Sequence, residues 1–545
     1  MIIVRLLVAA LCTIASPALF AAEGALAAPA AVPDKDAFLL AIIPDLRATL
    51  AKAEHIAGLF SPVPLPPGTL VESVGTALGD PGLANLGKGP MMVVVGPGTP
   101  TPTIALLLPG NDAKRYVDLA AQKGFLMGSV VKDVAVVSQT PDGQALGERV
   151  AAATGLPPVA AGTDVRLLIA PDRLNKAYGA FVTGMVQMAT MRIPQQPGQL
   201  PVAKLATLEV AGLMELIGAL DGSQIDITLD GDTVVVADLL SATPGSTLAK
   251  AMVAPAPGPN RAYTHFSAMP AMVQISGKAN LSAHNGYLVS LLEALRARPE
   301  GAELITQGFI DILKSLTGAW SGDLAMRIRS TDAAPMIMES VWGTGDAVKA
   351  QQAYEQALGI FVGDGALAKM YQNMGMTMVM SKNVRTTGGL PVMAQSWKID
   401  EAKLTNKMSA TFLKETQFAF GADYTASSQD PQMLDSLVAG NGTGLVLKAQ
   451  TSIGPGRDLY ADLDLVTLIL SQMQAIAPKA AGVKKPPPGE PVTAAITWGD
   501  GRSRIEVRVP LVPFVGMATA MQQLRPERAP RPPASQPVPA GGNTF

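Results

Sequence analysis

The sequence predicts an α+β fold: antiparallel sheets built from repeated hairpin–helix units, with helices packed on one sheet face and two similar halves. Three observations favour this class. Strand-forming segments alternate apolar and polar residues, which is typical of a sheet with one buried face. Tight-turn dipeptides join neighbouring strands, and helix-forming segments follow the hairpins. The order of these units then recurs along the 545-residue chain.

The first unit is predicted from two apolar strands at 91–96 and 103–110, followed by a helix at 111–124. The same order recurs in the second half. Strands at 323–330 and 335–343 precede a helix at 344–359, where Asp346 lies near the N-cap position. Aspartate is a preferred residue there because its side chain accepts hydrogen bonds from the first turn of a helix.

Two hairpins show the alternation most clearly. Asp230–Gly231 and Asp500–Gly501 are turn dipeptides that favour tight hairpins. One face of each hairpin is expected to be apolar, with Ile225, Ile227 and Leu229 in the first and Ile505, Val507 and Val509 in the second. The opposite face is expected to carry Gln224, Asp226 and Thr228, and Arg504, Glu506 and Arg508.

Isolated hairpins are too small to form separate cores, so their apolar faces are expected to merge beneath the helices. Leu324, Met326 and Ile328 follow the same alternation. The polar sheet face, with residues such as Arg327, Arg504 and Arg508, is then expected to be solvated or covered by the other half.

An internal duplication is predicted because a hairpin–helix segment closes each half, at 223–253 and at 492–524. The alternative is that similar secondary structure alone produces similar patterns. The predicted organisation is a signal peptide at 1–28, a first α+β lobe at 29–253, a proline-rich linker at 254–260, a second α+β lobe at 261–525, and a disordered proline-rich tail at 526–545.

The N-terminal residues predict export. Arg5 precedes an apolar run at 6–14, and Ala25–Leu26–Ala27 matches a small-residue cleavage site. An uncleaved anchor and a lipoprotein acylated at Cys12 are the alternatives. Cys12 is the only cysteine, so the mature chain is expected to hold no disulfide and no thiolate. We expect a periplasmic or extracellular protein without a transmembrane segment after signal cleavage.

Composition and motifs argue against several functions. Charged residues make up 16% of the chain and the net charge is −2, with no basic block, so nucleic acid is not an expected partner. His55, His265 and His284 are the three histidines, they lie in different units, and no G-x-S-x-G motif occurs. These observations favour a non-catalytic protein without a cofactor or metal. A hydrolase that uses carboxylates alone is the distant alternative.

Methionine is the most informative residue type, with 25 copies. Three interpretations are open: ordinary core filling, the lining of a site for varied apolar ligands, and a Cu(I) site, because thioethers are soft ligands. Alternation places two methionine groups on strand faces, Met336 and Met338 in one strand, and Met374, Met376, Met378 and Met380 in another.

The leading hypothesis is an exported, non-catalytic protein that binds a lipid, another apolar ligand or a hydrophobic segment between sheet and helices. Low charge and methionine-rich strands favour it, with the six methionines as candidate lining residues. The alternative is a structural or assembly module of the cell envelope, which would bind a protein partner through its sheet faces or its proline-rich tail.

Overall fold

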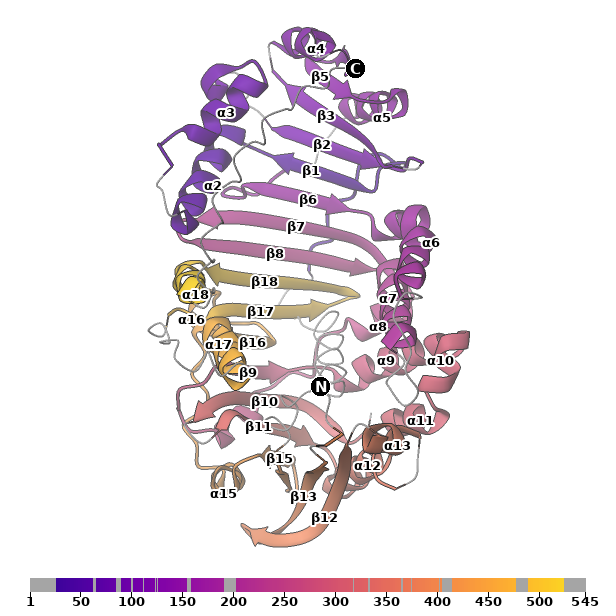
Figure 1. The fold of residues 1–545 in the computed structure, drawn as a ribbon, viewed down its shortest axis with the longest axis vertical. Coiled ribbons are helices and arrows are strands. Elements are labelled where there is room, and N and C mark those ends of the chain that lie inside the picture. The colour runs from indigo at the N-terminus through magenta and orange to yellow at the C-terminus, as the bar shows by residue number, and fades with distance from the viewer. Residues whose placement is uncertain are drawn as a thin grey trace, which may run out of the picture.

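The computed structural model describes residues 26–523, apart from 62–64, 85–89, 100, 111, 123, 125, 154–157, 191–201, 317, 332–333, 364–365, 374, 401, 404–413 and 477–488. Residues 1–25 of the predicted signal peptide, the predicted tail at 526–545 and Met374 therefore lie outside the described residues. The described residues form an α+β fold around one antiparallel sheet of 18 strands, so the predicted fold class is confirmed (Figure 1).

The sheet runs the whole length of the molecule. Its spatial order is β4-β5-β3-β2-β1-β6-β7-β8-β18-β17-β16-β9-β10-β11-β15-β14-β13-β12, and all neighbouring strands in this order pair antiparallel. The first eight strands are β1 (Leu39–Ile43), β2 (Met91–Gly96), β3 (Thr103–Pro109), β4 (Met127–Val131), β5 (Val134–Ser138), β6 (Val165–Ile169), β7 (Leu220–Asp230) and β8 (Thr233–Ala242). The others are β9 (Val273–Lys278), β10 (Trp320–Thr331), β11 (Ala334–Thr344), β12 (Met376–Thr387), β13 (Leu390–Ile399), β14 (Thr416–Phe420), β15 (Tyr424–Ser428), β16 (Leu459–Leu463), β17 (Val492–Gly499) and β18 (Arg502–Pro510).

Helices follow the strands throughout the chain. In the first half they are α2 (Leu46–Phe60), α3 (Thr69–Ala77), η1 (Pro81–Leu83), α4 (Ala113–Gln122), α5 (Pro141–Ala152), α6 (Pro171–Thr190), α7 (Val202–Gly218) and α8 (Thr247–Ala251). In the second half they are η3 (Ala262–His265), α9 (Leu281–Arg296), α10 (Pro299–Leu304), α11 (Gln307–Leu316), α12 (Ala347–Gly359), α13 (Ala366–Asn373), α15 (Pro431–Ala439), α16 (Lys448–Ser452), α17 (Leu465–Ile476) and α18 (Val512–Gln523). No helix among the described residues is both long and apolar enough to cross a membrane.

The two halves share one strand order. Outward from the centre of the sheet, the first half runs β8-β7-β6-β1-β2-β3-β5-β4, and the second runs β18-β17-β16-β9-β10-β11-β15-β14. The hairpin of β12 and β13 is additional and lies at the outer edge of the second half. Internal duplication would produce this correspondence, and the duplication itself stays a prediction.

The two hairpins predicted from turn dipeptides are present. β17 and β18 are joined by Asp500 and Gly501, whose φ values of 52° and 74° fit the tight turn that matches strand twist. β7 and β8 are joined one residue later than predicted, through Gly231 and Asp232, because Asp230 pairs with Thr233. The predicted cap is also present, since Asp346 accepts a hydrogen bond from the Lys349 amide at 3.0 Å.

Cross-strand register divides the sheet into two faces. We call the face that carries Ile225, Val236 and Ile505 the apolar face, and the face that carries Asp226 and Glu506 the polar face. The alternation predicted for β7, β10 and β18 holds, because residues paired across antiparallel strands lie on the same face.

The prediction that helices pack on one sheet face is wrong in part. On the apolar face, α2, α3 and α4 cover the first half and α7 to α12 cover much of the second. On the polar face, α5 covers β3 and β5, while η3, α15 and α16 cover the second half. The outer strands carry small and aliphatic residues on both faces, such as Leu107 on the polar face and Leu108 on the apolar face of β3, and therefore bury both.

Gly277 marks the close approach of β9 to β16, and its replacement tests the pairing. A Cβ at this position would overlap the carbonyl oxygen of Asp458 and the Cα of Leu459, which are backbone atoms that cannot rotate away. We expect Gly277→Ala to lower the free energy of unfolding by about 1–3 kcal/mol. In the matched control, Gly286→Ala in α9, the new Cβ meets open space, and a gain of about 0.5–1 kcal/mol is expected. Denaturant titration of both variants checks this, and equal stability would contradict the close approach.

Candidate apolar binding surface

Three rows of side chains cross the middle of the apolar face. The first row contains five aliphatic residues from five adjacent strands, Val165, Ile227, Val236, Val507 and Ala494. The second row contains Leu167, Ile225, Asp238, Ile505 and Ile496, and the third contains Leu229, Val234 and Val509. The apolar residues of these rows are named the central apolar surface. Five strands at about 4.8 Å spacing span roughly 19 Å.

The central apolar surface is partly exposed, as is the apolar face of the neighbouring strands β1 and β2. Ile496 is buried, and every other member of the three rows keeps part of its side chain accessible. The four branched members of the first row belong to none of the five core clusters in the described residues. A contiguous apolar patch of this kind typically marks an interaction site, whereas scattered exposed aliphatic residues do not.

The polar face of the same strands carries charged side chains that form ion pairs. Arg166 binds both carboxylate oxygens of Asp226, at 2.6 and 2.7 Å. Glu506 lies 3.6 Å from the guanidinium group of Arg504, and Arg504 is exposed. Charged and paired side chains therefore occupy the polar face of β6, β7 and β18 at the same height in the sheet, whereas β8 carries Val235, Ala237 and Leu239 there.

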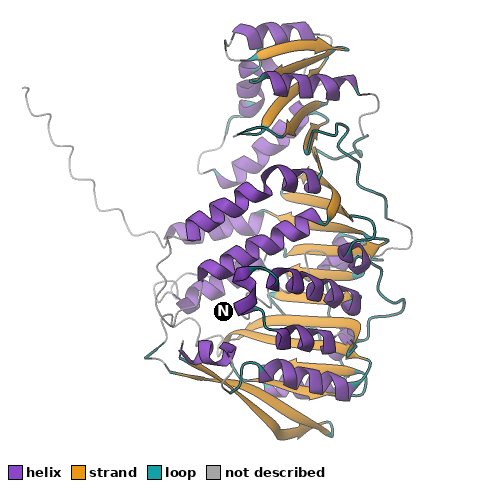
Figure 2. Cartoon of the chain, turned by 90° about the vertical axis from the view of Figure 1, so that its right-hand side faces the viewer, coloured by secondary structure: helices purple, strands orange, loops and turns teal. Residues whose placement is uncertain are grey.

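Helices stand on both sides of these central strands. Figure 1 shows α2 and α18 beside one end of β7, β8 and β18, and α6, α7 and α8 beside the other end. Figure 2 shows that the helices beside the second end of these strands form a row along the sheet. The central strands thus lie between two rows of helices.

Asp238 is the one titratable residue in the three rows. Its register partners are Ile225 and Ile505, and the hydroxyl of Ser223 donates a hydrogen bond to its Oδ1 at 3.1 Å. Burial raises the pKa of Asp238 to about 6, and the hydrogen bond from Ser223 opposes that rise. Sequence reasoning missed this residue, although Asp238 lies in phase with Val234 and Val236 in the alternating segment TVVVADLL.

The five described candidate methionines lie on the apolar face, but not together. Met336 and Met338 belong to β11, where Met338 is 37% exposed. Met376 and Met378, in β12, are buried, and Met378 packs with Met380 in a core that also contains Phe418. Three strands separate β11 from β12, so the two groups lie about 19 Å apart in the sheet and do not form one thioether cluster. Their role in ligand lining stays a prediction.

The three histidines lie in separate surroundings. His55 and Asp232 form an exposed pair at 2.7 Å. His265 bonds through Nδ1 to the carbonyl oxygen of Leu437 at 2.8 Å. His284 is 4% exposed and stacks on Trp498 at 4.9 Å, and burial lowers its pKa to about 4. Among the described residues, no group of three His, Cys, Asp or Glu side chains is arranged to hold a metal ion.

A cavity of about 600 Å³ lies at one end of the central strands. The segment Ala28–Val32 forms one wall, and α8 and the β17–β18 turn form others. Two of its cations are already engaged: Arg173 donates to the carbonyl oxygens of Asp34 and Ala37, at 2.7 and 2.9 Å, and Arg502 donates to that of Leu26. Because these contacts anchor the N-terminal segment, we assign the cavity to chain packing rather than to the ligand site.

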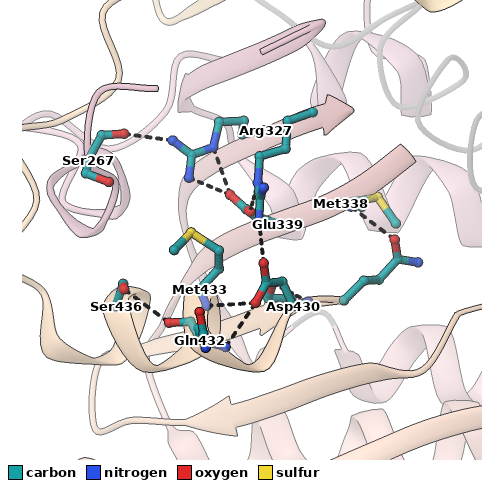
Figure 3. A network of polar contacts seen from close by, with 11 residues as sticks. Ser267, Arg327, Met338, Glu339, Asp430, Gln432, Met433 and Ser436 are labelled. Atoms are coloured by element: carbon teal, nitrogen blue, oxygen red, sulfur yellow. Dashed lines mark hydrogen bonds and ion pairs between the residues drawn. The ribbon is translucent and has the colours of Figure 1, made fainter. Parts of the chain in front are cut away.

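A buried charge network lies on the polar face of the second half (Figure 3). Glu339 is fully buried and accepts hydrogen bonds from Arg327 at 2.8 and 2.5 Å and from Arg329 at 2.6 Å. Arg329 also donates to Asp430 at 2.7 Å, and Arg327 donates to the carbonyl oxygen of Ser267 at 2.7 Å.

This network holds two strands and one helix of the second half together. Asp430 accepts hydrogen bonds from the amides of Gln432 and Met433 and so caps α15. Two cations balance two carboxylates, so the network ties β10 and β11 to that helix. The expectation that Arg327 would be solvated or covered by the other half is wrong: it is 1% exposed and lies 5.2 Å from the ring of Phe266, in the same half.

Comparison with known proteins assigns no family. The chain matches no protein-family model, and neither the curated proteins nor the solved structures searched contain a match to it. The candidate function therefore rests on the geometry of the surface itself.

The raised pKa of Asp238 predicts a pH-dependent gain in stability on its replacement. The folded protein holds this proton up to about pH 6, whereas an unfolded aspartate loses it near 4. The fold therefore loses stability as the pH rises from 4 to 6, and the cost stays complete above 6. We expect Asp238→Asn to raise the free energy of unfolding by at most about 3 kcal/mol at pH 8 and to leave it unchanged at pH 4. Urea titrations at both pH values check this, and an equal effect at the two values would contradict it.

The buried network predicts a large loss of stability when its central carboxylate is removed. Glu339→Gln leaves two buried guanidinium groups with one carboxylate, so we expect a loss of about 3–5 kcal/mol in the free energy of unfolding. Glu293→Gln breaks the exposed ion pair with Lys314, and a loss below about 1 kcal/mol is expected. Thermal unfolding of both variants checks the difference, and similar losses would show that Glu339 is not central to the network.

Proposed function

We propose that this protein is an exported, non-catalytic protein that binds an apolar ligand, such as a lipid chain, on the central apolar surface between the sheet and its flanking helices. One observation carries the proposal: an aliphatic row crosses five adjacent strands, yet stays partly exposed and outside the core clusters. The N-terminal segment, with Arg5 and the apolar run at 6–14, supports export.

The energy of binding would come from removing apolar surface from water. Each methylene group buried on the central apolar surface contributes about 0.8 kcal/mol. Valine and isoleucine side chains offer neither donors nor acceptors, so they favour an alkyl chain over a polar molecule. Binding a flexible chain also costs conformational entropy, which favours a long ligand that covers several strands.

An assembly module is the second candidate, and α6 favours it. Phe181, Met185 and Met188 recur at i, i+4 and i+7 and are 61%, 51% and 62% exposed. Such spacing produces an apolar stripe along one side of a helix, which suits packing against a partner helix. Crosslinking of purified protein to envelope fractions distinguishes this candidate, because the stripe would then lie at the contact.

A pair of substitutions in one strand tests the leading proposal. Val236→Glu places a carboxylate in the middle of the first row, whereas Val235→Glu places it on the polar face, opposite Arg508. We expect Val236→Glu to lower the affinity for a fluorescent alkyl-chain probe at least about tenfold, because a charge on this surface must be desolvated when the ligand binds. Val235→Glu should bind the probe as the wild type does.

Native mass spectrometry and lipid extraction of the protein purified from its producing cells complete this test. Co-purifying lipid that is depleted only in Val236→Glu supports the proposal. Wild-type protein that carries no lipid and binds no alkyl probe contradicts it.

A further inference from the structure

Asp238 interrupts the second row of the central apolar surface where an aliphatic residue would continue it. Its neighbours along the row are Leu167 and Ile225 on one side and Ile505 and Ile496 on the other. A carboxyl group among such side chains loses hydration without gaining a polar environment. The sheet supplies this carboxyl group with one hydroxyl, from Ser223, and its neighbours in the row supply no cation.

Two aspartates of the same hairpin show the contrast. Asp226, on the polar face, is held at both oxygens by the guanidinium group of Arg166. Asp238, on the apolar face, receives a neutral hydroxyl from Ser223 and has no ion pair among the described residues. Within the described part of the chain, one carboxylate is thus neutralised by a cation and the other is not, and the second lies beside a surface suited to alkyl chains.

From this juxtaposition we propose that Asp238, positioned by Ser223, binds the polar end of an amphipathic ligand, and that this end carries an ammonium group. The inference rests on the proposed function, because the alkyl part of the same ligand would lie along the first and third rows. A primary ammonium donates up to three hydrogen bonds and supplies the positive charge that Asp238 lacks.

The same geometry disfavours an anionic amphiphile. A fatty-acid carboxylate placed beside Asp238 would bring two negative charges together in a poorly hydrated site, where their repulsion is stronger than in water. An alcohol would still donate one hydrogen bond, without the charge. Ligands with one alkyl chain and three different ends therefore have a predicted order of affinity: ammonium first, alcohol second, carboxylate last.

Three matched probes test the order: a long-chain primary amine, the alcohol and the carboxylate with the same chain. Each probe is titrated into the full chain at pH 8, below its critical micelle concentration, and binding is followed by displacement of a fluorescent alkyl probe. We expect wild-type protein to bind the amine at least about tenfold more tightly than the carboxylate. In Asp238→Asn this ratio should fall to within about threefold, while the affinity for the alcohol stays unchanged.

Control variants separate a local charge effect from a general one. Asp232→Asn removes the same charge from the turn of the same hairpin, away from the three rows, and should keep the amine preference. Ser223→Ala removes the hydroxyl that positions Asp238 and should weaken the preference without abolishing it. Circular dichroism of each variant verifies that it is folded before binding is compared.

The outcomes distinguish this inference from the proposed function. Loss of the amine preference in Asp238→Asn alone supports the ammonium site. If wild type binds the three probes equally, or if Asp238→Asn keeps the preference, the inference is overturned while apolar binding stands. If wild type binds none of the probes, both fail.

A final experiment uses vesicles of phosphatidylethanolamine or phosphatidylglycerol to show whether the amine-bearing ligand is a membrane lipid. Uptake of phosphatidylethanolamine alone extends the inference to lipids. Preferential uptake of the anionic phosphatidylglycerol overturns it.

Discussion

The pairing of β8 with β18 is the interaction on which the rest of the structure depends. Nine residues of each strand pair in antiparallel register, from Arg502 with Ser241 to Pro510 with Thr233. Because side chains alternate between faces with a period of two, this register places the apolar side of both halves on the same face of one sheet. A slip by one residue would set Val507 and Val236 on opposite faces. The central apolar surface exists only because two halves, far apart in sequence, meet in this phase.

The two faces of the sheet bury their side chains in different ways. On the polar face of the second half, Arg327, Arg329, Glu339 and Asp430 enter the interior as a neutral network in which the charges satisfy one another. On the apolar face, Trp498 and Ile496 are covered by α8 and α9 with no charge required. The middle of the apolar face has neither solution, because its aliphatic residues are not fully covered and its single carboxyl group has no cation among the residues that the structure describes. These partly covered aliphatic residues and this carboxyl group locate the candidate site.

Much of the local structure was predictable, and the long-range structure was not. The alternation in 224–229 and 502–509 identified strands and their faces, and Asp500–Gly501 identified a hairpin, because these signals depend on neighbours in the sequence. Strand order depends on pairings such as β1 with β6 and β9 with β16, whose apolar segments would pair equally well elsewhere. The prediction about the methionines likewise depended on neighbours in the sequence. Alternation showed that Met376 and Met378 share a face, but only tertiary packing shows that helices bury them. Asp238 was visible as a polar residue in an apolar phase, a signal that gains meaning once β7 and β18 are known to flank β8.

A partly exposed apolar row and a carboxyl group with a single hydroxyl partner are each costly, and their coincidence suggests a single cause. Aliphatic residues on an open sheet invite aggregation, and an inward-facing charge is one way in which sheets limit it. That explanation accounts for the presence of a charge, but a lysine or an arginine would serve it equally well, and either could extend its charged end into water. Aspartate is too short to do so. Its carboxyl group stays level with Ile225 and Ile505, within reach of a molecule lying on the sheet, where Ser223 already holds one of its oxygens. The choice of a short acid at this position is therefore better explained by recognition of a bound cationic group than by protection of an exposed surface.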